Sequence, residues 1–306
     1  MTTLEELAQQ GDPGTLETED QARKIKLMDP QQLYEVWERQ HWMSQDIDLS
    51  KDRAHWEAFT EEERDQMLYN LSAFFIGEER VTTQFSALVM AYEDESEESF
   101  LATQQVDEAR HMQFFDRFYR EVIGLDEEDF SGRLARVRER LNEAFGKLFD
   151  ESLVEAGKAL IADPTDRGAK VDFITTYHMV IEGTLALTGQ HFITSFFEQR
   201  DVMPGFVDGF GKVARDEHRH VAYGTWYLAQ SAGGDDELAR RMQAKLQELI
   251  PVAAGVLTPP GYEVGEDYEI LGYTSAEVQE FAFKSLTRRL KAIGVPLQPT
   301  EKPVPA

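Results

Sequence analysis

Two short segments with almost the same five residues constrain the fold of this 306-residue chain more than any other feature. Residues 107–111 read Asp-Glu-Ala-Arg-His, and residues 216–220 read Asp-Glu-His-Arg-His. Each contains Glu-x-x-His, and residues three apart on a helix share a face, so a carboxylate and an imidazole can converge on one ion. A single match has little weight, since residues 38–41 also fit it. The shared flanking Asp and Arg make the pair more specific and favour two ligand-bearing helices.

An acid in an apolar helical stretch precedes each of these segments. Glu78 lies among aromatic and aliphatic residues, and Glu182 is the only Asp, Glu, Lys or Arg between Asp172 and Glu198. Burying a carboxylate is costly unless it is paired or binds a metal. Glu78 and Glu182 are therefore candidate metal ligands, and Glu79 competes with Glu78 for the first position.

Two antiparallel helical hairpins would bring these acids level with the repeated segments. The first hairpin turns near residues 93–98 and the second near 200–205, so each carries one Glu and one Glu-x-x-His at a similar depth. Four carboxylates and two imidazoles in a four-helix bundle are the arrangement of ferritin-like di-iron and di-manganese proteins. The predicted metal ligands are Glu78, Glu108, His111, Glu182, Glu217 and His220.

The donor atoms indicate the kind of metal. The chain has no cysteine, which excludes disulfides and thiolate sites, and hard oxygen donors with one imidazole per ion suit iron or manganese. Asp216 is expected to form a hydrogen bond with the imidazole of His111, as acids behind a metal-bound histidine often do. The alternative for Asp216 is an ordinary acid on a helix surface.

The remaining sequence predicts an all-α fold, a ferritin-like four-helix bundle core with additional helices, and no alternation long enough for a sheet. Helices are predicted at 31–44, 61–92, 99–123, 127–147, 148–162, 167–199, 204–230, 235–249 and 276–292. The domain prediction is a polar arm over 1–30, one helical domain over 31–293 with a metal-binding core at about 60–230, and a tail over 294–306. Thr60 is expected to cap the second helix and Gly124 to end the third.

Composition narrows the function classes. No apolar run approaches the length of a membrane span, and the acidic N-terminus does not read as a signal peptide. A net charge of −26 repels phosphate backbones and argues against nucleic-acid binding. The cytoplasm is the expected compartment.

With the six ligands in place, the chain resembles the ribonucleotide reductase small subunit superfamily, and within it the ligand-binding oxidases that assemble a mixed manganese–iron centre. The likeness covers about residues 60–230. Residues 77–82 look like that group's first-ligand segment, in which a valine, here Val81, follows the glutamate by three residues. Tyr177 lies five residues before Glu182, as the group's reactive tyrosine does. The spacing of Glu182 and Glu217 also fits the group.

The resemblance implies that the metals activate dioxygen, and that the centre joins the Tyr177 oxygen to the β-carbon of Val81 as an ether. It also implies a long-chain fatty acid in an apolar tunnel with its carboxylate on the metals, a Mn/Fe centre with Fe/Fe as the alternative, and a homodimer. The chain departs from the group in one respect. The segment from Glu78 to Glu108 is shorter than in the group by about one turn of helix. A shorter connection between the two helices would account for this difference.

Two other functions are weighed. Phe115, four residues after His111, occupies the place where class I reductase small subunits carry a radical tyrosine, so a small subunit that stores its oxidising equivalent on the metals is the alternative. The tail at 300–306 lacks the aromatic anchor through which such subunits normally dock. Ferritin-like metal storage is less favoured, because the chain is much longer than a ferritin subunit. The pocket-lining candidates are Phe114, Phe115, Phe196 and Met179, with core packing as the default.

Overall fold

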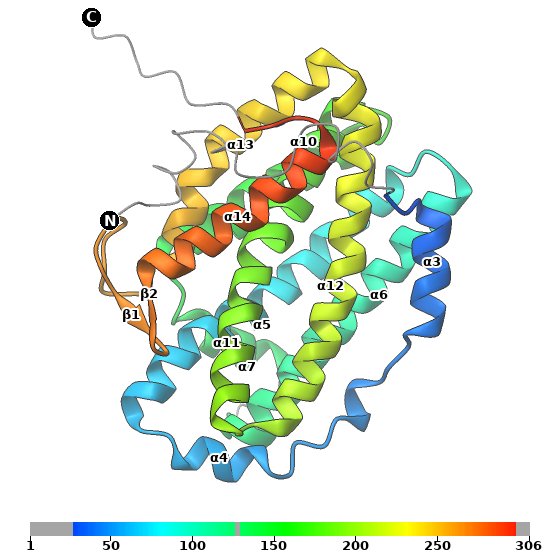
Figure 1. Ribbon diagram of the computed structural model, residues 1–306. Coiled ribbons are helices and arrows are strands. Elements are labelled where there is room, and N and C mark those ends of the chain that lie inside the picture. The colour runs from blue at the N-terminus through cyan, green and yellow to red at the C-terminus, as the bar shows by residue number, and fades with distance from the viewer. Residues whose placement is uncertain (1–26, 126–128, 298–306) are drawn as a thin grey trace, which may run out of the picture.

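Four long helical segments form the centre of the molecule (Figure 1). They are α5 (Glu61–Met90), α6 (Glu95–Phe118), the continuous run of α10 (Arg167–Ile174), η4 (Thr175–Ala186) and α11 (Leu187–Arg200), and α12 (Pro204–Ser231). The computed structural model describes residues 27–125 and 129–297. Most of the predicted arm at 1–30 and of the predicted tail at 294–306 lies outside them. The all-α, ferritin-like class predicted from the sequence is confirmed.

Further helices surround these four. α3 (Pro30–Arg39) packs on α6, while α13 (Asp236–Leu257) and α14 (Ser275–Ile293) pack on η4. The smaller helical elements are η1 (Ser44–Asp46), α4 (Asp52–Ala58), η2 (Tyr119–Ile123), α7 (Phe130–Arg138), α8 (Glu143–Gly146), η3 (Lys147–Ser152), α9 (Leu153–Ala162) and η5 (Ala232–Gly234). A short antiparallel hairpin precedes α14. It consists of β1 (Glu269–Ile270) and β2 (Tyr273–Thr274), with Glu269 opposite Thr274.

Local signals fix several helix ends as predicted. Thr60 and Glu63 form a capping box at the start of α5, in which each side chain accepts a hydrogen bond from the other residue's backbone N–H. Gly124 ends η2 with a left-handed φ of 80°, and Pro204 occupies the first turn of α12.

Other boundaries were predicted wrongly. The acidic stretch 93–98 is not a turn throughout, because Asp94 accepts hydrogen bonds from Ser96 and Glu97 and starts α6 at Glu95. α13 continues past residue 249 and through Pro251 to Leu257. The predicted helix 127–147 is divided among α7, α8 and η3, and α4 was not predicted.

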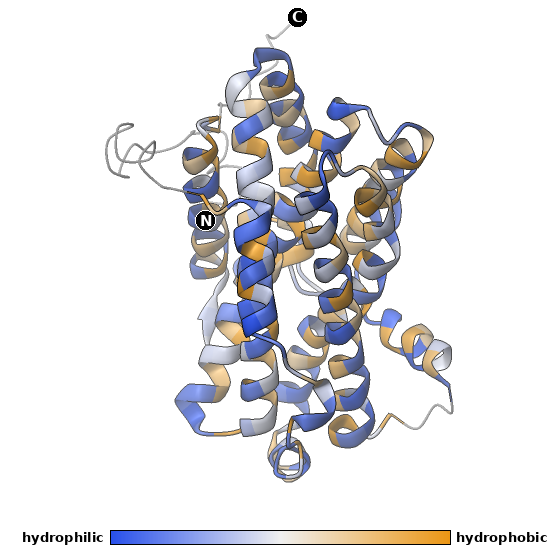
Figure 2. Ribbon diagram, turned by 90° about the vertical axis from the view of Figure 1, so that its right-hand side faces the viewer, coloured by the Kyte–Doolittle hydropathy of each residue, from blue (hydrophilic) through white to orange (hydrophobic). Residues whose placement is uncertain are grey.

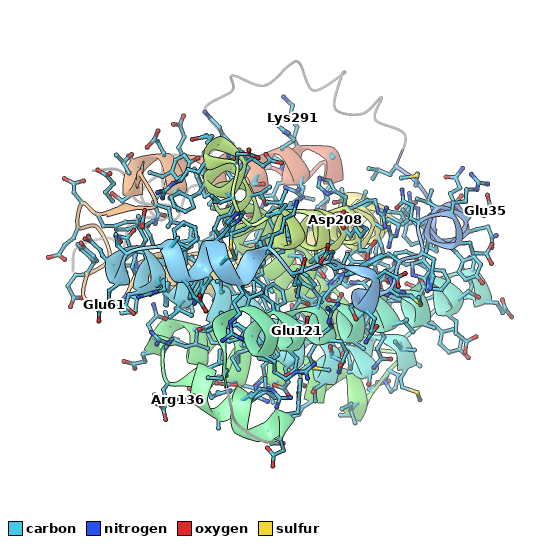
Figure 3. All side chains as sticks on the ribbon, turned by 90° about the horizontal axis from the view of Figure 1, so that it is seen from below. Glu35, Glu61, Glu121, Arg136, Asp208 and Lys291 are labelled. Carbon is cyan, nitrogen blue, oxygen red and sulfur yellow. The ribbon has the colours of Figure 1, made fainter. Side chains whose placement is uncertain are left out.

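Polarity is divided between the inside and the outside of the bundle. Hydrophobic and hydrophilic residues alternate along the ribbons in Figure 2, as expected for helices with one buried face. Charged side chains such as Glu35 and Glu61 project outward at the edges of Figure 3. Among the described helices, none is both long and apolar enough to cross a membrane.

Candidate metal centre

The bundle brings the six predicted ligand residues together at its centre. α5 supplies Glu78, α6 supplies Glu108 and His111, η4 supplies Glu182, and α12 supplies Glu217 and His220. Each of these side chains is between 0% and 6% exposed. The neighbouring Glu79 is half-buried and pairs with Arg80 instead, with 3.2 Å between the charged atoms. Geometry therefore separates Glu78 from Glu79, and the shorter turn between α5 and α6 still leaves Glu78 within the cluster.

The six side chains form two overlapping groups, within each of which the potential ligand atoms lie within 4.8 Å of one another. The first group is Glu78, Glu108, His111 and Glu217, and the second is Glu108, Glu182, Glu217 and His220. Glu108 and Glu217 belong to both. Two carboxylates shared between two four-residue groups are placed to bridge a pair of ions.

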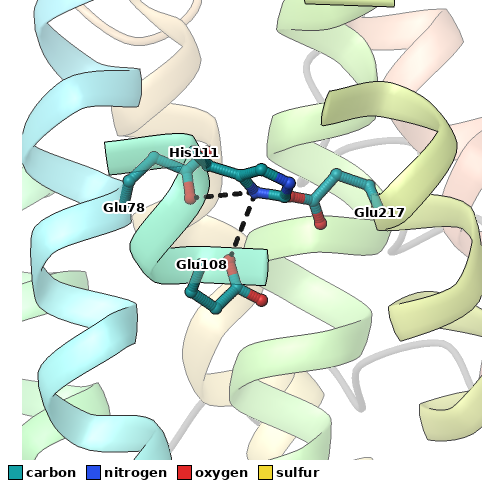
Figure 4. A group of neighbouring side chains, drawn as sticks. All are labelled: Glu78, Glu108, His111 and Glu217. Atoms are coloured by element: carbon teal, nitrogen blue, oxygen red, sulfur yellow. Dashed lines mark ion pairs between the residues drawn. The ribbon is translucent and has the colours of Figure 1, made fainter. Parts of the chain in front are cut away.

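The Nδ1 atoms of the two histidines face into this cluster. His111 Nδ1 lies 3.5 Å from Glu78 Oε2 and 3.3 Å from Glu217 Oε1. Figure 4 shows these two acids on either side of the His111 ring. His220 Nδ1 lies 3.0 Å from Glu108 Oε1 and 3.5 Å from Glu217 Oε2. Each ring thus presents one nitrogen to the carboxylates of its group.

Several of these inward-facing atoms make no hydrogen bond of acceptable angle within the described part of the chain, although carboxylate oxygens lie close to the two nitrogens. They are His111 Nδ1, His220 Nδ1, Glu182 Oε2 and Glu217 Oε2. Buried polar atoms in folded proteins are nearly always paired. Four that converge in one place indicate that cations complete the site, and carboxylate oxygens with imidazole nitrogens are donors that manganese and iron accept. The residues present therefore fit a di-metal centre.

The electrostatics of the cluster lead to the same conclusion. Burial raises the pKa of Glu78 to about 8 and, together with a neighbouring carboxylate, holds the pKa of Glu182 well above its usual range. Burial alone would lower the pKa of His111 and His220, but Glu78 and Glu108, respectively, hold both well above the usual range. These raised pKa values favour bound protons on Glu78, Glu182 and the two imidazoles. Metal ions would replace those protons.

Two aspartates hold the outer nitrogens of the imidazoles. Asp216 Oδ2 lies 3.3 Å from His111 Nε2, and Asp107 Oδ2 lies 3.2 Å from His220 Nε2. Both contacts leave Nδ1 free to face the cluster. The sequence predicted the contact of Asp216 but not the matching one of Asp107. The missed signal was the Asp that precedes Glu in both repeated segments.

An arginine and two tryptophans fix the two aspartates. Arg219 Nη2 donates to Asp107 Oδ2 at 2.9 Å and to Asp216 Oδ1 at 2.7 Å. Trp37 Nε1 donates to Asp107 Oδ1 at 2.9 Å, and Trp42 Nε1 donates to Asp216 Oδ2 at 2.6 Å. These three residues were not predicted, although Arg219 stands at the arginine position common to both repeated segments. Hydrogen bonds of this kind orient a histidine ligand and raise its basicity.

Residues 21–298 match the family model described as ribonucleotide reductase, small chain. The chain belongs to this family. The small-chain match therefore covers nearly the whole sequence and includes both Glu-x-x-His segments.

Solved structures similar to this member of the small-chain family include R2-like ligand-binding oxidases. One, a tyrosine-to-phenylalanine variant with an anaerobically reconstituted Mn/Fe cofactor, is 26% identical over 87% of this chain and 93% of its own, with a TM-score of 0.75. Another, a variant with a glycine replaced by phenylalanine and the same kind of cofactor, is 25% identical over the same shares, with a TM-score of 0.73. The oxidase from Sulfolobus acidocaldarius is 25% identical over 86% of this chain and 89% of its own, with a TM-score of 0.72.

Tyr177 contacts the cluster of this small-chain family member directly. Its hydroxyl donates to Glu108 Oε1 at 2.6 Å, and Gln104 Nε2 lies 3.3 Å from the same hydroxyl oxygen. Gln104 Nε2 also lies 3.4 Å from Glu182 Oε1. Burial and Glu108 hold the pKa of Tyr177 well above its usual range, so the phenol keeps its proton. Gln104 was not predicted, since nothing in its local sequence distinguishes it from a surface glutamine.

An apolar pocket opens onto the carboxylates. Its lining includes Glu78, Val81, Glu108, Glu182 and Glu217. Its walls include Phe74, Ile181, Leu185, Phe192 and Ile193, and Leu257, Pro259 and Leu271 also line it. The lining candidates Phe114, Phe115, Phe196 and Met179 were wrong, because none of them lines this pocket. Phe115 stacks at 5.8 Å behind Phe74, which takes the lining position instead.

Proposed function

We propose that this protein is a di-metal oxidase that activates dioxygen and acts on, or is occupied by, a long-chain fatty-acid-like molecule. The observation that carries the proposal is the pair of ligand groups that share Glu108 and Glu217, both of which line an apolar pocket. Bound redox metals would supply reductive activation of dioxygen. The chain supplies the ligands, excludes water and places an organic molecule beside them.

A mixed Mn/Fe centre is the proposed cofactor, with Fe/Fe as the alternative. Both metals accept the same oxygen and nitrogen donors, so loading depends on availability as well as on the site. The structural relatives that carry a reconstituted Mn/Fe cofactor support the mixed centre. Glu78 and His111 would hold one ion, Glu182 and His220 the other, and Glu108 and Glu217 would serve both.

The ligand proposal rests on the polarity of the pocket. Leu185, Ile193 and Leu257 offer an apolar lining, and the candidate ligands Glu78, Glu108, Glu182 and Glu217 line the same pocket. An acyl chain fits the wall through burial of its methylene groups, at about 0.8 kcal/mol each. The carboxylate of a fatty acid would face the cations, since it is the one group of such a molecule that binds hard metals.

A covalent link between Tyr177 and Val81 is the third part of the proposal. Val81 lines the pocket beside Glu78, and Phe85, one helical turn further along the same face of α5, packs its ring 5.3 Å from that of Tyr177. Forming the ether removes a hydrogen from the Tyr177 hydroxyl and another from the β-carbon of Val81. Oxygen then bonds to carbon, and the two electrons pass to dioxygen together with the proton from the β-carbon. Glu108 accepts the hydrogen bond of the hydroxyl and is placed to take its proton.

Peptide mass spectrometry before and after air exposure tests the reaction. Protein loaded with manganese and iron without oxygen should give separate Val81 and Tyr177 peptides. After exposure to air we expect one joined species, lighter by a pair of hydrogens than the sum. Tyr177→Phe should abolish it, whereas Tyr119→Phe, which alters a buried tyrosine bonded to Ser72, should not.

The ligand is tested by solvent extraction of the purified protein. We expect a long-chain fatty acid bound to the wild-type chain. Ala73→Trp would fill the pocket and should remove the lipid, whereas Ala102→Trp on the exposed face of α6 should not. Equal lipid in both variants would contradict the ligand proposal.

A different outcome would favour the reductase small subunit. If the metals react with oxygen but no joined peptide forms, Phe115 becomes the more informative residue. It is fully buried where class I small subunits carry a radical tyrosine, so the oxidising equivalent would have to stay on the metals. Activation of a ribonucleotide reductase large subunit would then be measured.

A further inference from the structure

Three residues after His220 on α12, Tyr223 lies in a buried polar cluster that the proposed reaction does not use. Its hydroxyl donates to Glu97 Oε1 at 2.5 Å, and Lys170 Nζ donates to the same oxygen at 2.8 Å. Tyr223, Glu97 and Lys170 are all 0–1% exposed. A phenol, a carboxylate and an ammonium group are thus held together away from water, which is costly unless each has a partner.

Tyr223, like Tyr177 and Tyr227, has a carboxylate partner, whereas other buried tyrosines have neutral partners. Tyr119 pairs with the hydroxyl of Ser72, and Tyr69 donates to the carbonyl of Val256. Burial and the Glu97 charge hold the pKa of Tyr223 well above its usual range, so its resting phenol is protonated. A phenol that loses an electron becomes strongly acidic, and Glu97 is already in place to receive its proton.

Aromatic rings connect this cluster with the metal centre. The rings of Tyr177 and His178 lie 4.6 Å apart and those of His178 and Tyr223 lie 5.3 Å apart, both edge to face. These spacings are direct contacts between aromatic groups. Gly224 permits this approach, because a Cβ at its position would overlap the side chain of His178.

The ring contacts continue from Tyr223 toward the surface. Trp226 lies 6.1 Å from Tyr223, centroid to centroid, and is only half-buried. Lys170 Nζ also lies 3.4 Å from Glu93, whose side chain is 48% exposed. The cluster therefore has an aromatic route to the outside and a separate polar route for a proton.

We propose that Tyr223 is a second oxidisable tyrosine, which relays oxidising equivalents from the metal centre through His178 to the surface at Trp226. Its O–H bond breaks in the step: one electron passes through the rings of His178 and Tyr177 to the oxidised metals, and the proton passes to Glu97. The product is a neutral phenoxyl radical beside a carboxylic acid. A soluble one-electron reductant at Trp226 restores the phenol, and Glu97 returns the proton.

This inference rests on the proposed function, because the oxygen-activated metals are the oxidant. It adds a role to that function. When the pocket holds no oxidisable molecule, the relay carries the oxidising equivalent away from the ligands and the pocket. Lys170 serves as a positioning residue, because its ammonium group donates to Glu97 Oε1 and holds that carboxylate beside Tyr223.

Freeze-quench electron paramagnetic resonance of the metal-loaded protein tests the relay. A Tyr177→Phe background keeps a ring in the route and removes the competing ether. On mixing with oxygen we expect an organic radical whose spectrum narrows when ring-deuterated tyrosine is incorporated. Tyr223→Phe in this background should remove the signal and Tyr119→Phe should retain it. A signal unchanged by Tyr223→Phe, or oxidised metals with no radical, would overturn the proposal.

Glu97→Gln separates the proton acceptor from the fold. The amide keeps the size of the side chain and accepts the Tyr223 hydrogen bond, but it is a much weaker base. We expect a smaller radical yield at equal metal oxidation, with a helical circular dichroism spectrum like that of the wild type. An undiminished yield would refute the role of Glu97.

Metals that do not react with oxygen would refute the proposed function but not the relay. A light-driven experiment tests the relay in that case. Metal-free protein is oxidised with a photogenerated ruthenium(III) tris-bipyridine complex, and phenoxyl absorption is followed in time. Tyr223→Phe should lower the phenoxyl yield and Trp226→Phe should slow its appearance, whereas Tyr119→Phe should change neither. Traces identical to the wild type in the first two variants would overturn the relay.

Discussion

Glu78 belongs to one ligand group and Glu217 to both, so alanine at these positions should change metal binding to different extents. We expect Glu78→Ala to weaken one site and leave the other, whereas Glu217→Ala weakens both. A ligand that binds only the folded state at a hundredfold excess over Kd stabilises it by about 2.7 kcal/mol per site. Two sites thus give roughly 5 kcal/mol, and at about 2–4 °C for each kcal/mol a Tm rise of about 10–20 °C.

The assay is a thermal melt with and without metal, combined with metal content per chain after dialysis. Glu78→Ala should keep about half of the metal-dependent rise in Tm, and Glu217→Ala should keep almost none. Glu79→Ala is the matched control, because its side chain pairs with Arg80 outside the cluster. Equal losses in Glu78→Ala and Glu217→Ala, or metal loss in Glu79→Ala, would refute the assignment of Glu217 to both ions.

Three further substitutions test other parts of the structure. Asp216→Asn removes the charge behind one histidine and should lower metal affinity about 10- to 100-fold at one site in titration calorimetry; unchanged affinity would contradict that role. Lys170→Met leaves the buried Glu97 without its cation and should lower the free energy of unfolding in urea by about 3–5 kcal/mol; a near-neutral effect would contradict the need for a cation beside Glu97. Gly209→Ala places a Cβ against the ring of Phe114 and should cost about 1–3 kcal/mol, whereas Gly211→Ala, with open space around it, should not destabilise.

Features with a local cause could be predicted from the sequence. Thr60 and Glu63 cap α5 through residues three apart, and Gly124 adopts the left-handed conformation that glycine tolerates. The Glu-x-x-His spacing likewise places Glu108 beside His111 whenever that segment is helical. Each of these inferences needs one turn of helix and no knowledge of its neighbours.

Contacts between distant segments could not be predicted in the same way. Arg219 reaches Asp107 across 112 positions of the chain, and Trp42 reaches Asp216 across 174. Both contacts depend on how α12 is rotated against α6 and on where the segment after α3 crosses them. Periodicity reports which face of a helix is apolar, but it does not report which polar residue on another helix that face meets.

The π-helix η4 (Thr175–Ala186) shows most clearly how backbone geometry completes the site. Tyr177 and Glu182 are five residues apart, which is about 1.4 turns of an α-helix and would point them to different sides. Hydrogen bonds from i to i+5 widen the turn and return such residues to one face. The Oγ1 of Thr184 accordingly donates to the carbonyl of Met179, five residues earlier, at 2.7 Å.

The consequence is visible at a single side chain. Gln104 contacts Tyr177 and Glu182 with the same nitrogen, at 3.3 and 3.4 Å, which requires both to face α6. With an α-helix assumed, the five-residue spacing did not by itself place Tyr177 on the same side as Glu182. The sequence linked the tyrosine to the metals only through the resemblance to a family. The wider helix gives the physical reason: it presents a candidate ligand and a reactive phenol side by side, within a segment whose first eleven residues are buried.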